Sequence, residues 1–245
     1  MSLQISNVKK QYRGEQIGKK NLVLKGVDYE LENGQVLAIV GQNGAGKSTL
    51  IKCILSFLKP DEGSITMNGM QIEEVIKRGK VGYMPEAFTG PEIISVRQYM
   101  EDLLILRGLN PNDYKERLEE LTERFFMKKH LEKPFSRCSK GTVKKVIFLQ
   151  SILHNPTLLV LDEPTDGLDP VSRRIMLNEI RKVKEDGGTV IITTHLLSDL
   201  SLVSDKVIVL QGGRIIADAD CKDLSSSLDD WYFETLMKNG GIDEL

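Results

Sequence analysis

The sequence is poor in cysteine and contains no long apolar run. Its cysteines, Cys53, Cys138 and Cys221, are far apart, which is typical of a reducing compartment and argues against a disulfide framework or a zinc site. No apolar stretch approaches the ~18 residues that a membrane span needs. The first residues lack a basic segment followed by an apolar one, so we expect no signal peptide. These absences predict a cytoplasmic chain that reaches a membrane only through a partner.

An excess of charge of either sign is also absent. The formal net charge of −2 excludes a global field that would attract nucleic acid or an anionic membrane. The 245 residues suffice for one large α/β domain, or for a core domain that carries an inserted subdomain. We therefore look for the function in local motifs.

A glycine-rich segment follows the apolar run 36–40 and precedes the apolar run 50–55. The pattern G-x-x-x-x-G-K-[ST] between a buried strand and a helix is typical of a phosphate-binding loop. Its glycines let successive backbone N–H groups point into one concavity, and the start of the helix adds unpaired N–H groups. The segment therefore predicts a nucleoside triphosphate site, formed by Gly41, Gln42, Asn43, Gly44, Ala45, Gly46, Lys47, Ser48 and Thr49. Lys47 places a cation on the β- and γ-phosphates, and Ser48 offers a hydroxyl to Mg²⁺.

Apolar runs that alternate with helical segments predict an α/β fold. In the N-terminal part we expect strands at 22–24, 27–31, 64–68 and 80–83, a turn at 32–34, and a helix from the phosphate loop to about residue 59. In the C-terminal part we expect strands at 157–161, 189–193 and 206–210, and a helix that Asp169 and Pro170 begin and Gly187 ends. Uninterrupted apolar strands predict a mainly parallel sheet. The fold class is a P-loop NTPase core with an N-terminal antiparallel β portion.

The middle of the chain has a helical character. Ser95 and Gln98 form a capping-box pattern before a helix that Gly108 ends, and a second helix is expected at 113–127. Its apolar side consists of Leu118, Leu121, Phe125 and Phe126. We therefore expect a helical subdomain at about 85–155, inserted in a core of residues 1–84 and 156–220, with a tail at 221–245.

Two adjacent carboxylates, Asp162 and Glu163, end the apolar run 158–161. Adjacent residues of a strand point to opposite sides, so the two carboxylates have different roles. Asp162, at the end of the strand, can reach the coordination sphere of Mg²⁺. Glu163, where Pro164 breaks the strand, orients or deprotonates a water molecule. Hydrolysis of a phosphoanhydride requires this division between a metal ligand and a base.

The segment 162–170 resembles the second carboxylate motif and following loop of the ABC transporter ATPases, and other motifs of that family follow in order. Tyr12 matches the aromatic residue that stacks on adenine, and Glu86 falls at the Q-loop, where it contacts Mg²⁺ or a water molecule. Ser139 and Gly141 fall in the family signature, and His195 matches the switch histidine. Two departures are Glu86 in place of glutamine and the signature Cys-Ser-Lys-Gly-Thr in place of Leu-Ser-Gly-Gly-Gln.

The resemblance implies an ATPase subunit of a membrane transporter, with ATP and Mg²⁺ as cofactors. The family uses Ser139 and Gly141 on the nucleotide of the opposite subunit, so a second ATPase chain is an expected partner. An integral-membrane permease is the other expected partner, which places the chain on the inner face of the membrane; nucleic acid is not expected. The two departures and the tail 228–234 resemble the exporters whose permease is a separate chain. The alternatives are a soluble ABC-type ATPase acting on nucleic acid or ribosomes, and a regulatory module without turnover.

Overall fold

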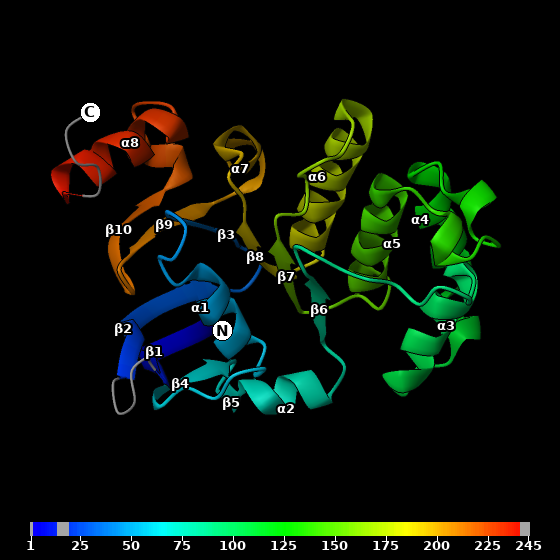
Figure 1. The fold of residues 1–245 in the computed structure, drawn as a ribbon, viewed down its shortest axis with the longest axis horizontal. Helices are drawn as coiled ribbons and strands as arrows, with labels where there is room; N and C mark the ends of the chain where they lie inside the picture. The colour runs from blue at the N-terminus through cyan, green and yellow to red at the C-terminus, as the bar shows by residue number, and fades with distance from the viewer. Residues whose placement is uncertain (1, 14–19, 241–245) are drawn as a thin grey trace.

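Two β-sheets organise residues 2–13 and 20–240, which are the residues that this computed structural model describes (Figure 1). The first sheet is antiparallel, with the strand order β2–β1–β4–β5. It consists of β1 (Ser2–Arg13), β2 (Lys20–Glu32), β4 (Glu62–Met67) and β5 (Met70–Gln71). This sheet confirms the predicted antiparallel portion near the N-terminus.

The second sheet has the strand order β10–β9–β3–β8–β7–β6. Its strands are β3 (Val36–Val40), β6 (Val81–Met84), β7 (Leu158–Asp162), β8 (Thr189–Thr193), β9 (Lys206–Gln211) and β10 (Arg214–Asp220). Neighbours from β9 to β6 are parallel, and β10 is an antiparallel edge strand. The sheet is therefore mainly parallel, as the uninterrupted apolar strands predict.

Helices cover both faces of the parallel sheet, and alternate side chains of its strands enter two separate apolar clusters. In β3, Val36, Ala38 and Val40 join the cluster shared with the helices of the middle segment, whereas Leu37 and Ile39 join the cluster beneath the first sheet. The helices are α1 (Lys47–Ile54), α2 (Ile72–Lys77), α3 (Val96–Leu106), α4 (Lys115–Arg124), α5 (Lys140–Ile152), α6 (Pro170–Glu185), α7 (Leu197–Val203) and α8 (Leu228–Lys238). Burial on both faces explains why these strands lack polar alternation.

Between β6 and β7 the chain is helical, and this segment lies to one side of the sheet (Figure 1). Ser95 caps α3 as predicted, accepting a hydrogen bond from the Gln98 N–H at 3.2 Å, and Gly108 follows α3 with φ of 74°. Asp169 likewise caps α6 through the Ser172 N–H at 2.9 Å. These caps satisfy N–H groups that the first turn of a helix leaves unpaired.

Several predicted boundaries are wrong. The strands expected at 22–24 and 27–31 are one strand, β2, because Gly26 (φ 90°) forms a bulge that keeps it paired with β1. Helix α1 ends at Ile54 instead of near residue 59, since Ser56 adopts a left-handed backbone with φ of 55°. The helix expected at 113–127 ends at Arg124. Phe126, with φ of 56°, is 68 % exposed and does not belong to the buried side.

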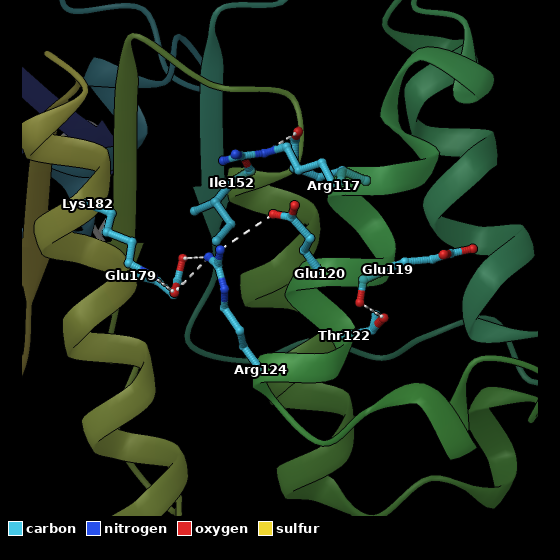
Figure 2. A network of polar contacts seen from close by, with 9 residues as sticks. Arg117, Glu119, Glu120, Thr122, Arg124, Ile152, Glu179 and Lys182 are labelled. Atoms are coloured by element: carbon cyan, nitrogen blue, oxygen red, sulfur yellow. Dashed lines mark hydrogen bonds and ion pairs between the residues drawn. The ribbon is translucent and has the colours of Figure 1, made fainter.

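A polar network ties the middle segment to α6 (Figure 2). The side chain of Glu179 on α6 is 6 % exposed and accepts hydrogen bonds from Arg124 of α4 at 3.2 Å and from Lys182 at 2.7 Å. Arg117 of α4 donates to the backbone oxygens of Ile152 and Leu153, at the end of α5. Arg124 thus joins α4 to the buried Glu179 carboxylate of α6, which also pairs with Lys182 of its own helix.

Replacing Arg124 with methionine is expected to lower the free energy of unfolding by about 1–2 kcal/mol, because charged hydrogen bonds to a buried group are lost while Lys182 still neutralises Glu179. Urea unfolding measures this change. The matched control is Lys77→Met, which removes an exposed partner of Glu74 and is expected to change stability by less than about 0.5 kcal/mol. Equal effects of the two variants would contradict a tie between α4 and α6.

Candidate active site

Three neighbouring parallel strands, β3, β8 and β7, end at the same edge of the sheet. Adjacent strands are about 4.8 Å apart, so the chains that leave β3 and β7 lie about 10 Å from each other. A cavity of about 390 Å³ opens there. Its lining residues are Asn21, Val23, Gln42, Asn43, Gly44, Ala45, Gly46, Lys47, Ser48, Thr49, Glu86, Asp162, Glu163 and His195.

The glycine-rich loop after β3 is packed too closely for side chains at two positions. A Cβ at Gly41 would lie 2.2 Å from the backbone oxygen of Leu210, and Gly46 has φ of 111° with Leu24 only 3.0 Å from its Cβ position. The oxygen of Ala45 accepts a hydrogen bond from the Gly213 N–H at 3.0 Å. The loop is thus held against the turn between β9 and β10, and its backbone faces the cavity.

The start of α1 points into the same cavity. Its N-cap is Gly46, no described side chain caps it, and its first turn contains no acidic residue. The first N–H groups of a helix, left without a side-chain acceptor, form a site for an anion. This end of α1 fits a phosphate group.

Among the described residues that line the cavity, Lys47 supplies the ammonium group. Its Nζ donates to the backbone oxygens of Gly41 at 2.5 Å and Gln42 at 3.1 Å. Burial lowers the pKa of the Lys47 amine, while Glu163, Asp162 and Glu86 oppose that shift. A bound polyphosphate would favour the charged amine further, since opposite charge stabilises the ionised form.

Asp162, the last residue of β7, accepts a hydrogen bond at 2.5 Å from the Thr193 hydroxyl at the end of β8. This bond orients one carboxylate oxygen. Asp162 and Ser48 both line the cavity. Carboxylate and hydroxyl oxygens are ligands that suit Mg²⁺, which otherwise binds phosphate oxygens and water. The described residues contain no cluster of three or more histidine, cysteine or acidic side chains that could hold a metal alone. This donor set fits Mg²⁺ bound together with a nucleotide.

Glu163 is 7 % exposed and has a left-handed backbone, with φ of 48°. Its N–H donates to the oxygen of Thr193 at 3.0 Å, so the pairing with β8 continues past the end of β7. One carboxylate oxygen accepts from the His195 N–H at 3.1 Å, and the other lies 3.2 Å from His195 Nε2. These contacts hold the Glu163 carboxylate at the cavity, where it can position a water molecule.

Not all predicted site residues line this cavity. Tyr12 of β1 is exposed and pairs with Asn21, which does line it. Gly141 lines a second cavity of about 380 Å³, and Glu86 lines both cavities. Ser139 is exposed and caps α5, accepting from the Thr142 N–H at 3.2 Å. The structure thus separates the signature residues from the phosphate loop of the same chain.

Sequence reasoning missed two lining residues, Asn21 and Val23 of β2. They enter the cavity because β2 pairs with β1 beside Tyr12, and no local motif marks them. Thr193 was also missed as the partner of Asp162, although its place at the end of the apolar run before His195 was a usable signal.

A parallel sheet with a glycine-rich loop after one strand and two carboxylates after another defines a P-loop ATPase. Residues 24–166, more than half of the chain, match the family model described as ABC transporter. The chain belongs to this family and is an ATP-binding ATPase subunit of the ABC transporter type.

Curated relatives agree with this assignment. The chain is 32 % identical to the ABC-type transporter ATP-binding protein EcsA of Bacillus subtilis, over 91 % of this chain and 94 % of that protein. It is also 32 % identical to the ABC transporter ATP-binding protein NatA of the same organism, over 81 % of this chain and 82 % of the relative.

Solved structures agree as well. The structure of an ATP-binding subunit of an ABC transporter covers 96 % of this chain and 99 % of its own, with a TM-score of 0.86 and 28 % identity. A dimeric, post-hydrolysis structure of the ATP-binding cassette MJ0796 with ADP and phosphate has a TM-score of 0.81 at 21 % identity, over 91 % of this chain and 100 % of its own, a likeness in fold. None of the helices in the described part of the chain is long and apolar enough to cross a membrane.

Proposed function

We propose that this subunit closes with a second ATPase chain around two Mg-ATP and thereby drives export through a separate permease. The observation that supports this proposal is that the predicted site residues do not all line one cavity. Phosphate and metal residues line one cavity, whereas Ser139 and Gly141 of the same chain lie outside it. A site completed by the signature of a second chain accounts for this division. The dimeric structure of MJ0796, which shares the fold, supports the proposal.

Each site residue then has a role that follows from its position. Tyr12 stacks on adenine, and the loop from Gly41 to Thr49 binds the phosphates, with Lys47 on the β- and γ-phosphates. Ser48 and Asp162, with Glu86 as a further oxygen donor, would hold Mg²⁺, and the ion would supply positive charge to the phosphate oxygens. Glu163 positions the attacking water and accepts its proton, and His195 orients the Glu163 carboxylate through the observed contacts.

The domain division remains part of the proposal. Residues 1–84 and 156–220 form the nucleotide-binding core, 85–155 the helical subdomain and 221–245 the C-terminal tail, of which 241–245 lie outside the described residues. The sharing of one apolar cluster between α3, α5 and the sheet supports a subdomain that moves with limited freedom. The loop from Glu86, at the boundary, would relay its motion to the permease at the inner face of the membrane.

Mixing two inactive variants tests the composite site. Lys47→Ala and Ser139→Ala chains are each expected to hydrolyse little ATP alone. A mixed dimer pairs the intact loop of the Ser139→Ala chain with the intact signature of the Lys47→Ala chain. Since a two-fold dimer has two equivalent sites, random pairing restores about a quarter of the parent activity. Steady-state ATPase assays at several protein concentrations measure this recovery.

A second signature variant controls for the capping role of Ser139. A Cβ at Gly141 meets no described atom within 4 Å, so Gly141→Ala leaves the single chain unstrained and disturbs only a partner that packs there. Gly141→Ala should therefore complement Lys47→Ala in the same way. Specific activity independent of concentration, without recovery in either mixture, would mean that one chain hydrolyses ATP alone.

A further inference from the structure

The second cavity brings together α5 and the loop that leaves Glu163. Among its lining residues are Lys144 on α5, Asp166 and Gly167 on the loop, and Glu86 at the wall shared with the first cavity. Only about 16 % of the Lys144 side chain is exposed, which is little for a lysine. A charged group placed there needs a partner, because burial penalises an unpaired charge.

The partner of Lys144 is the backbone of the Glu163 loop. Its Nζ donates to the backbone oxygen of Asp166 at 2.6 Å and lies 4.0 Å from the Asp166 carboxylate. Burial lowers the pKa of the Lys144 amine, and Asp166, Glu163 and Glu86 oppose this shift in that order. The ammonium group therefore lies within the electrostatic field of the carboxylates at both cavities.

Glu163 depends on contacts on both sides because its backbone is left-handed, a conformation that the surrounding structure must impose. On the β8 side, the contacts come from Thr193 and His195. On the α5 side, the loop three residues after Glu163 is held by Lys144. Ser139 caps the N-terminus of the same helix, five residues before Lys144.

We propose that Lys144 is a positioning residue for ATP hydrolysis: its hydrogen bond to the Asp166 oxygen couples the signature end of α5 to the loop that aims Glu163 at the cavity. The inference rests on the proposed function, in which Glu163 positions the attacking water and α5 meets the nucleotide of the second chain. A shift of α5 would move the Asp166 oxygen with it. Lys144 thereby makes the orientation of Glu163 depend on the position of the signature.

The test separates positioning from folding and from ATP binding. Lys144→Met keeps the length of the side chain and removes the ammonium group. We expect its kcat to fall at least about tenfold, with KM for ATP within about threefold of the parent and an unchanged midpoint of thermal unfolding. Lys144→Arg, which can still donate to the Asp166 oxygen, should recover most of kcat. Lys145→Met is the matched control, because Lys145 is the next lysine of α5, is buried to a similar degree, and lies 3.9 Å from the exposed Asp169 carboxylate. Its kcat should stay within about twofold.

The outcomes divide clearly. Should Lys144→Met fail to fold, Lys144→Gln replaces it under the same criteria. Turnover within twofold of the parent, or a loss that Lys144→Arg does not recover, overturns the proposal. If Glu163→Gln loses turnover while Lys144→Met keeps it, the role of Glu163 stands and that of Lys144 falls. If Glu163→Gln also keeps turnover, the role of Glu163 falls and that of Lys144 falls with it.

Discussion

Replacing Glu163 with glutamine is expected to lower kcat for ATP hydrolysis by about 100-fold or more, the lower part of the range that a positioned acid–base group contributes. Glutamine keeps the size of the side chain and can still accept the His195 N–H, but it cannot take a proton from water. The affinity for ATP should stay near that of the parent. Intact ATP should then hold two chains together, and size-exclusion chromatography with Mg-ATP should show a dimer.

The matched control is Glu73→Gln, which makes the same chemical change at an exposed position of α2. It should leave both turnover and elution volume unchanged. Turnover of Glu163→Gln within twofold of the parent would contradict the assignment of Glu163 as the base, whether or not the variant forms a dimer.

Lys47→Ala should reduce the affinity for ATP by at least about 100-fold, or about 2.7 kcal/mol, which is the size expected for one or two hydrogen bonds from a charged group. The structure contains no second lysine or arginine among the described lining residues that could replace it. Alanine also removes the amine that donates hydrogen bonds to the backbone oxygens of Gly41 and Gln42 in this structure. Equilibrium binding of a fluorescent ATP analogue measures the loss.

Lys52→Ala is the control for charge, because Lys52 lies on the same helix at an exposed position and does not line the cavity. Its affinity for ATP should match the parent. If Lys47→Ala bound the nucleotide within threefold of the parent, the loop backbone alone would account for phosphate binding. The cation would then serve only the chemical step.

Local signals in the sequence predicted the parts of the fold that short-range interactions decide. The capping serine and aspartate begin α3 and α6 where expected, and the apolar runs at 36–40 and 189–193 are buried strands. Boundaries failed where a single residue adopts a left-handed backbone, as Ser56 and Phe126 do. Neither residue type marks such a conformation, which here closes the C-terminus of a helix: the Ser56 N–H donates to the oxygen of Cys53, and the Phe126 N–H to that of Glu123.

The site could be predicted in its chemistry but not in its geometry. Alternation along a strand places Asp162 and Glu163 on opposite sides, yet both line one cavity because Glu163 leaves the strand in a left-handed turn. Asn21 and Lys144 reach the two cavities only through contacts between segments distant in the sequence. Such contacts depend on the tertiary fold, which no local pattern encodes.

The left-handed backbone of Glu163 also affects which substitutions evolution can accept at this position. A non-glycine residue held in the left-handed region costs about 1–3 kcal/mol of folding stability. Glycine at position 163 would relieve that strain and remove the carboxylate, so selection for stability and selection for turnover oppose each other at one residue. A lineage that no longer needed hydrolysis would be free to accept glycine there. Glycine at position 163 in a descendant of this chain would therefore indicate that selection for hydrolysis had been lost.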